Sequence, residues 1–226
     1  MYRATNRRLL ASALIVTGFL VSCGGSSSPS SPKMSVFGVV GSSLARWAVV
    51  GYSDLGGSRS WSNEAVAEYG GGSIVAWLDD IASPSSRYWS RFRAGLESEP
   101  GTDQIWWQIA VRDRHDPPPV ILLPSDEQAV LRVVEEIRAL AGQGMVIFVS
   151  PMPEFDEATG CGVPGSAGAE ISRLMADFAA DQGVALRGPD MQRITTQNYN
   201  GPNDPCHQGP LGREQHGQVL RDFFGG

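Results

Sequence analysis

Residues 36–50 read VFGVVGSSLARWAVV: an apolar run, a Gly-Ser-Ser corner, and a second apolar run that begins at Leu44. The first run is typical of a buried strand, and the glycine and serines then turn the chain into the next element. A serine at such a turn either caps a helix or presents a nucleophilic hydroxyl. Ser42 and Ser43 are the two candidates, and the function of the domain depends on which role each of them has.

Strand-like and helical patterns alternate along the rest of the chain. Apolar runs predict strands over residues 35–40, 104–111, 145–150 and 184–186. Helices are expected near residue 74 and over residues 84–96, 125–142, 169–180 and a last segment that ends at Phe224, with Ser125 as the cap of the third. This alternation indicates an α/β domain whose parallel sheet is covered by helices on both faces. Ligands bind beyond the carboxyl ends of such strands, so the loops after Val40, Val111 and Ser150 should share one rim.

The N-terminus has the pattern of an export signal. Three arginines precede an apolar stretch over residues 9–21, which is too short for a comfortable membrane span. The stretch ends at residues 20–23, LVSC, which resemble a bacterial lipobox, where the cysteine is lipidated and becomes the new N-terminus. The alternative is an ordinary secretory signal with an unrelated cysteine. A lipid on Cys23 would anchor the protein to a membrane surface without spanning it.

The residues after Cys23, GGSSSPSSPK, are too polar and flexible to pack against a core. We therefore expect a signal peptide over residues 1–22, a lipidated cysteine and tether over 23–33, and one folded domain over 34–226. The glycine that follows Cys23 is not an inner-membrane retention signal of the aspartate type. An outer-membrane or cell-surface location is therefore favoured.

Charge and cysteine content limit the partners and the chemistry. The chain carries a formal charge of −6, and removing residues 1–22 removes three arginines and no acidic residue, which gives −9. Nucleic acid is not an expected partner, because phosphate binding needs clustered cations. Once Cys23 is lipidated, Cys161 and Cys206 remain. Two cysteines in an exported domain favour one disulfide, and the alternative is two free thiols.

The polar residues on the predicted rim can supply a nucleophile, a base and an acid that orients the base. The sequence here resembles the SGNH, or GDSL-type, hydrolase family, whose first block is Gly-Asp-Ser-Leu after the first strand. Residues 41–44, GSSL, match that block with Ser42 in place of the aspartate, which makes Ser43 the candidate nucleophile. The last family block, Asp-x-x-His, matches Asp204 and His207 ahead of the C-terminal helix.

The middle blocks of the family match less closely. The second block contributes a glycine whose N–H binds the oxyanion, and Gly72 resembles it, with Gly71 as the alternative. The third block is Gly-x-Asn-Asp, and residues 110–113 read AVRD, so Arg112 stands where the family has its oxyanion-binding asparagine. A guanidinium is a charged donor that can stabilise an oxyanion if it reaches the same point. The resemblance therefore implies an oxyanion hole made by Ser43, Gly72 and Arg112.

The resemblance covers the whole predicted domain and implies a three-layer α/β/α, flavodoxin-like fold with a central parallel sheet. It also implies an exported serine ester hydrolase that forms an acyl-enzyme and requires no metal and no cofactor. Two alternatives remain: a surface lipoprotein that keeps the fold but only binds a glycan or a partner, and an acyltransferase that uses the same three residues.

The aromatic residues and the two remaining histidines bear on the substrate and on the choice of base. Aromatic residues near the first two blocks favour an O-acyl ester of a polysaccharide as substrate, with a lipid or a small ester as the alternative. Core packing is the other interpretation for at least half of them: Trp47, Tyr52, Trp61, Tyr69 and Trp77. His115 is expected in a solvated loop rather than in a metal site. His216 lies in the last helical pattern, where we expect a surface or rim position.

Overall fold

The computed structural model describes residues 35–62, 72–83 and 86–226. The expected signal peptide (1–22) and the lipidated cysteine with its tether (23–33) lie outside these residues, as do Tyr69 and Gly71. Among the described residues, no helix combines the length and the hydrophobicity needed to cross a membrane.

The core of the domain is a sheet of four parallel strands in sequence order. The strands are β1 (Val36–Val40), β2 (Thr102–Ile109), β3 (Val146–Pro151) and β4 (Leu186–Arg187). Residues 59–61 run parallel to β1 at its free edge, where Phe37 N donates to Arg59 O at 2.7 Å and Trp61 N donates to Phe37 O at 3.1 Å. The sequence did not indicate this short edge segment, but the prediction of a parallel sheet is confirmed.

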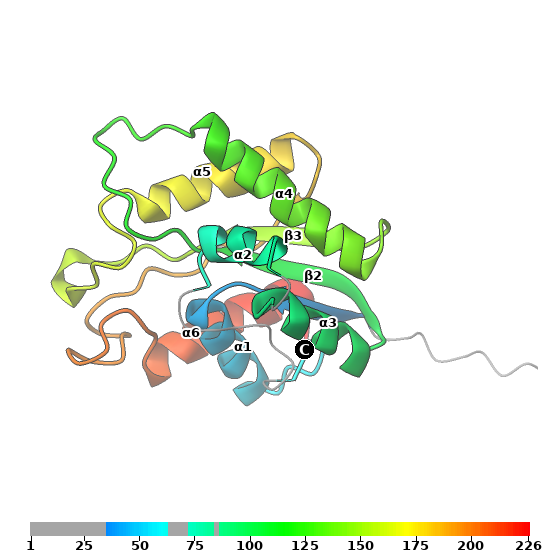
Figure 1. Cartoon of the computed structure of the whole chain (residues 1–226). Coiled ribbons are helices and arrows are strands. Elements are labelled where there is room, and N and C mark those ends of the chain that lie inside the picture. Colours follow the sequence, from blue (N-terminus) through cyan, green and yellow to red (C-terminus); the bar gives the residue numbers. More distant parts are fainter. Residues whose placement is uncertain (1–34, 63–71, 84–85) are drawn as a thin grey trace, which may run out of the picture. The chain divides into compact units, whose positions relative to one another are not determined.

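Six α-helices and one short 3-10 helix connect the strands within the described residues. They are α1 (Ser43–Asp54), α2 (Ile74–Ile81), α3 (Tyr88–Ser98), α4 (Pro124–Ala141), η1 (Glu157–Thr159), α5 (Gly168–Asp181) and α6 (Pro210–Phe224). Figure 1 shows α4 and α5 on one face of the sheet and α1 and α6 on the other. The arrangement is an α/β fold consistent with three layers, and the near-continuous apolar runs of β1 to β3 follow from burial on both faces.

Helices α1 and α6 pack so closely that their backbones touch. A Cβ atom on Gly51 would lie 1.8 Å from Arg213 O, and one on Gly217 would lie 2.2 Å from the carbonyl carbon of Gly51. Any larger side chain at either glycine would therefore separate the two helices. This contact matters for the site, because α1 begins at Ser43 and α6 follows His207 by only a few residues.

Two aspartates, rather than the expected serine, organise helix starts. We predicted Ser125 as the cap of α4, but the helix begins one residue earlier at Pro124, and Asp126 Oδ2 accepts from Leu123 N at 3.0 Å. Proline is favoured in the first turn because its missing N–H has no partner there anyway. Asp80, at the end of α2, accepts from Tyr88 N at 2.6 Å and so caps the start of α3.

Candidate active site

The structure gives the two adjacent serines different positions. Ser42 is buried and forms the N-cap of α1, where its Oγ accepts from Leu44 N at 3.3 Å. Ser43 is the first residue of the helix and lines a cavity at the carboxyl end of β1. The capping role therefore belongs to Ser42, which leaves the hydroxyl of Ser43 available for chemistry.

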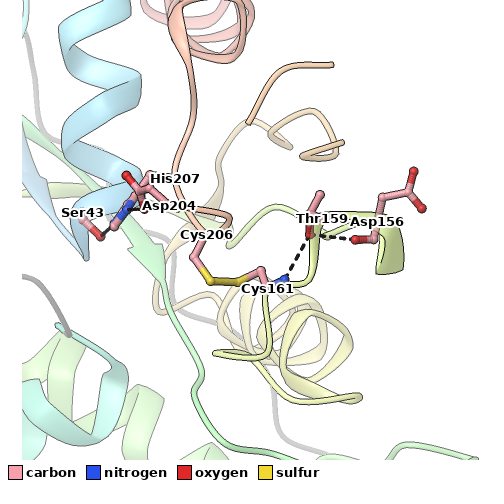
Figure 2. The surroundings of a disulfide bond; sticks show 7 residues. All are labelled: Ser43, Asp156, Thr159, Cys161, Asp204, Cys206 and His207. Atoms are coloured by element: carbon pink, nitrogen blue, oxygen red, sulfur yellow. Dashed lines mark hydrogen bonds and ion pairs between the residues drawn. A yellow bond between two sulfur atoms is a disulfide. The ribbon is translucent and has the colours of Figure 1, made fainter. Parts of the chain in front are cut away.

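Ser43, His207 and Asp204 form a continuous chain of hydrogen bonds (Figure 2). The distance from Ser43 Oγ to His207 Nε2 is 2.7 Å, and the distance from His207 Nδ1 to Asp204 Oδ1 is 2.5 Å. A carboxylate can only accept, so the proton between the last two groups lies on Nδ1. In neutral imidazole Nε2 is then an acceptor, and the hydroxyl of Ser43 donates to it.

Asp204 is held by the loop that precedes α6. Its backbone N–H donates to Gly201 O at 3.0 Å, and Asn200 Nδ2 donates to its second carboxylate oxygen at 2.7 Å. Partial burial raises the pKa of Asp204, but the hydrogen bonds from Asn200 and His207 outweigh burial and leave the pKa below its ordinary value. The carboxylate is therefore ionised at neutral pH. Sequence reasoning missed Asn200, whose only signal is its place four residues before Asp204.

The predicted disulfide between Cys161 and Cys206 is present, with Cα atoms 5.0 Å apart. Cys206 immediately precedes His207, and Cys161 lies in the loop after β3, where its N–H donates to Thr159 Oγ1 at 3.2 Å. Figure 2 shows the bond between these two loops, beside the Ser43–His207 contact. The disulfide thus fixes the segment that carries His207 to the loop that follows β3.

Gly72 is buried directly against the first block. A Cβ atom at Gly72 would lie 2.6 Å from Gly41 O, and that carbonyl also accepts from Trp77 Nε1 at 3.2 Å. A larger residue cannot occupy this position without displacing the backbone next to Ser43. The neighbouring Ser73 caps α2 and lines the same cavity as Ser43. Gly71, the alternative oxyanion residue, lies outside the described residues.

Arg112 and Arg114 lie two residues apart but have different surroundings. Arg114 is bound by two carboxylates, with Asp116 at 2.6 Å and Asp126 at 2.9 Å. Arg112 is exposed, lines the cavity of Ser43, and makes no ion pair with any described residue. Arg114 therefore holds the loop after β2 to α4, whereas the guanidinium of Arg112 is available to a ligand.

The cavity beside Ser43 has a volume of about 210 Å³ and a mostly apolar wall. Its apolar lining comes from the start of α1 and from the loops that follow β2 and β3: Leu44, Val111, Met152, Phe155, Val163 and Pro164. A second cavity of about 660 Å³ is also lined by Ser73, Val111 and Arg112 and carries more charged groups. Arg112 thus lies at the boundary between an apolar and a polar compartment.

The core alternative holds for three of the aromatic residues, and the expectation for His216 is wrong. Tyr52, Trp61 and Trp77 are fully buried in the core and form no exposed platform for a sugar ring. Trp47 is half-buried, and the guanidinium of Arg213 lies 4.9 Å from its ring centre. His216, which we expected at the surface or rim, is also fully buried, because it lies on the face of α6 that packs into the domain.

Within the described residues, no three His, Cys, Asp or Glu side chains are placed to hold a metal ion. Neither the protein-family models nor the curated proteins contain a match to this chain. The interpretation of the site therefore depends on its geometry and on the sequence blocks that lead to it.

Proposed function

We propose that the protein is an exported serine ester hydrolase of the SGNH type, anchored through a lipid on Cys23. One observation carries this proposal: the hydrogen-bonded chain from Ser43 through His207 to Asp204 opens into an apolar cavity. This is the arrangement that activates a serine hydroxyl, because the base is oriented and its positive charge is stabilised by the carboxylate.

In the proposed reaction, Ser43 Oγ attacks the ester carbonyl carbon while its proton passes to His207 Nε2. The tetrahedral intermediate then breaks the bond between carbon and the alcohol oxygen, and the alcohol leaves with the proton from His207. Water attacks the resulting acyl-enzyme, again losing a proton to His207. Release of the acid returns that proton to Ser43, so each cycle consumes one ester and one water, regenerates the protein groups, and needs no redox partner.

The oxyanion would be stabilised by donors at the end of the sheet. Ser43 is the first residue of α1, so its N–H has no partner inside the helix and lies at the positive end of the helix dipole. The N–H of Gly72 and the guanidinium of Arg112 are the other two donors in this proposal. The close contact of Gly72 with Gly41 supports its role, because it brings the start of α2 against the turn that carries Ser43.

The two cavities support separate binding positions for the acyl part and the alcohol part of an ester. The apolar cavity beside Ser43 suits a short acyl chain, since burial of apolar surface favours binding. The larger cavity, lined by Arg112, Asp79 and Asp113, suits a polar alcohol such as a carbohydrate hydroxyl. This charged lining, rather than the buried aromatic residues, now supports an O-acyl carbohydrate ester.

The strand order supports the finer fold assignment. If residues 59–61 are counted as the second strand along the chain, the spatial order becomes 2-1-3-4-5. That order is the one found in flavodoxin-like doubly wound sheets, where the ligand site lies at the carboxyl ends of the strands. Ser43 follows β1 at this point, as the proposed SGNH-type fold requires.

Labelling with a fluorophosphonate tests the proposal, because such probes form an adduct only with an activated serine. We expect intact-mass analysis of the oxidised chain, carrying Cys23→Ser to prevent lipidation, to show one adduct. The adduct should be absent in Ser43→Ala and retained in Ser42→Ala. A folded, oxidised protein that forms no adduct would instead favour the surface lipoprotein that binds a glycan or a partner. If an adduct forms, product analysis with a carbohydrate acceptor separates hydrolysis from acyl transfer.

A further inference from the structure

His216 is a fully buried histidine that the proposed reaction does not use. Its Nε2 lies 2.8 Å from the carbonyl oxygen of Gln192, so this nitrogen carries the proton and donates. Its Nδ1 lies 2.9 Å from Gln208 Nε2 and therefore accepts. Burial lowers the pKa of His216 to about 4, which keeps the ring neutral at physiological pH and preserves these two roles.

The side-chain amide of Gln208 connects this histidine to helix α1. Gln208 is buried, and the same Nε2 that donates to His216 also donates to Leu44 O at 3.1 Å. Both partners are acceptors, so the orientation of the amide is determined by its surroundings. The Oε1 atom of Gln208 is buried without a partner among the described residues. An unsatisfied buried oxygen costs free energy, so this orientation is kept at the expense of stability.

The hydrogen bond between Gln208 and Leu44 joins the sequence neighbours of the base and the nucleophile. Gln208 directly follows His207, and Leu44 directly follows Ser43. The hydrogen bond from Gln208 to Leu44 therefore spans the same two segments as the contact between His207 and Ser43. Among the described residues, these two contacts are the side-chain hydrogen bonds that join residues 43–44 to residues 207–208.

We propose that Gln208 and His216 are positioning residues that set the distance between Ser43 Oγ and His207 Nε2. Gln208 holds the two segments together, and His216 fixes the amide in the orientation that makes the bond to Leu44. This inference rests on the proposed function for its effect on rate, although the positioning itself is independent of it. Displacement of a catalytic group by about 1 Å can cost a factor of about 100 in rate.

The test compares two glutamine-to-methionine variants in the full chain carrying Cys23→Ser. Gln208→Met removes the amide while keeping the length of the side chain. Gln108→Met is the matched control, because Gln108 is also fully buried and neither polar atom of its side chain has a partner among the described residues. Each variant is tested for its thermal midpoint, for its fluorophosphonate labelling rate, and for the downfield proton resonance of His207 Nδ1, assigned by its absence in His207→Gln.

We expect folded Gln208→Met to be labelled about 10- to 100-fold more slowly, with a broadened or absent His207 resonance. Its thermal midpoint should be lowered as well, because the buried Nδ1 of His216 loses its donor, so labelling is measured well below that midpoint. Gln108→Met should keep the parent labelling rate and His207 resonance, with an equal or higher thermal midpoint because two unpaired buried polar atoms are removed. His216→Phe should give a smaller slowing, because the amide can still reach Leu44 but is no longer oriented. This last variant also carries the test if Gln208→Met does not fold.

The inference is overturned if Gln208→Met keeps the parent labelling rate and resonance, or if Gln108→Met is impaired to the same degree. The proposed function can fail separately. In that case the parent protein is not labelled, yet the His207 resonance is present in it and is lost only in the Gln208 and His216 variants. Gln208 and His216 would then still position His207 against Ser43, in a site with a different function.

Discussion

The hydroxyl oxygen of Ser43 and the Nε2 nitrogen of His207 lie 2.7 Å apart, although 164 residues separate them along the chain. This distance depends on contacts between elements rather than on local structure. The glycine contact between α1 and α6 and the Cys161–Cys206 disulfide both act on the segments that carry the pair. Changes at these points should therefore alter activity without touching the reacting atoms.

Asp204→Asn should lower kcat on a chromogenic ester by a factor on the order of 10⁴, as the equivalent change does in a well-studied serine protease. The amide no longer holds Nδ1–H of His207, so the tautomer that can accept the proton of Ser43 is lost. Asp156→Asn is the matched control, since the carboxylate of Asp156 points away from the disulfide and the site in Figure 2. Equal activity in the two variants would contradict the role of Asp204.

Loss of the disulfide should affect both stability and the site. Replacing Cys161 and Cys206 together by serine should lower the free energy of unfolding by about 2 to 4 kcal/mol, measured by urea denaturation. The loop that carries His207 would also be less restrained, so the labelling rate of Ser43 should fall even where the protein is fully folded. A variant that is destabilised but labelled at the parent rate would limit the disulfide to general stabilisation.

Ser42→Ala separates the roles of the two serines. Removing the N-cap hydroxyl of α1 should lower the free energy of unfolding by about 1 kcal/mol, because Leu44 N loses its acceptor. The fluorophosphonate adduct on Ser43 should persist. Thermal denaturation and intact-mass analysis of the same sample check both statements, and loss of the adduct in folded protein would reverse the assignment of the serines.

Replacement of Arg112 tests its place in the oxyanion hole. Arg112→Met should lower kcat by a factor of about 10² to 10³, as removal of one such donor does elsewhere, with a smaller change in KM. Arg112→Asn, which introduces the residue found in the family, should lose less activity. Arg132→Met, at an exposed arginine on α4, is the matched control for the loss of one positive charge. A rise in KM with unchanged kcat would instead assign Arg112 to substrate binding.

The sequence allowed prediction of the features that depend on local pattern. Apolar runs led to the parallel sheet, and turn chemistry together with the two outer family blocks led to Ser43, Asp204 and His207, which the structure brings together. The disulfide followed from counting cysteines. Each of these features depends on residue type and order along the chain, which a sequence displays directly.

The features that were missed depend on what a segment packs against. His216 is expected at the surface or rim of the last helical pattern, yet His216, Leu220 and Phe224 recur every four residues, which is the spacing of a buried helix face. That signal was available. Gln208 had no comparable signal, because a buried amide is recognised only when its partners on α1 and α6 are known. For the aromatic residues near the first two blocks the sequence leaves groove and core open, and the structure places Tyr52, Trp61 and Trp77 in the core, as their size favours.

The burial of His216 should make stability depend on pH between about 4 and 6.5. The folded protein binds a proton at this residue only near its pKa of about 4, whereas the unfolded chain binds one near the ordinary value of 6.5. Between these values the unfolded state holds more protons, so the free energy of unfolding falls as the pH is lowered. The total effect is about 3 kcal/mol, since one pKa unit corresponds to about 1.4 kcal/mol.

Comparison with His216→Phe isolates this contribution from those of the other titrating groups. Asp80 and Asp204 have pKa values below 3.8, so the stability that they contribute is present above that pH and is lost only as the pH falls further. Urea denaturation at a series of pH values should therefore show a steeper loss between 6.5 and 4 in the parent protein than in His216→Phe, and parallel curves below 4. Parallel curves over the whole range would mean that His216 is accessible to protons in the folded state, and would remove the reason for assigning it a fixed role as an acceptor for Gln208.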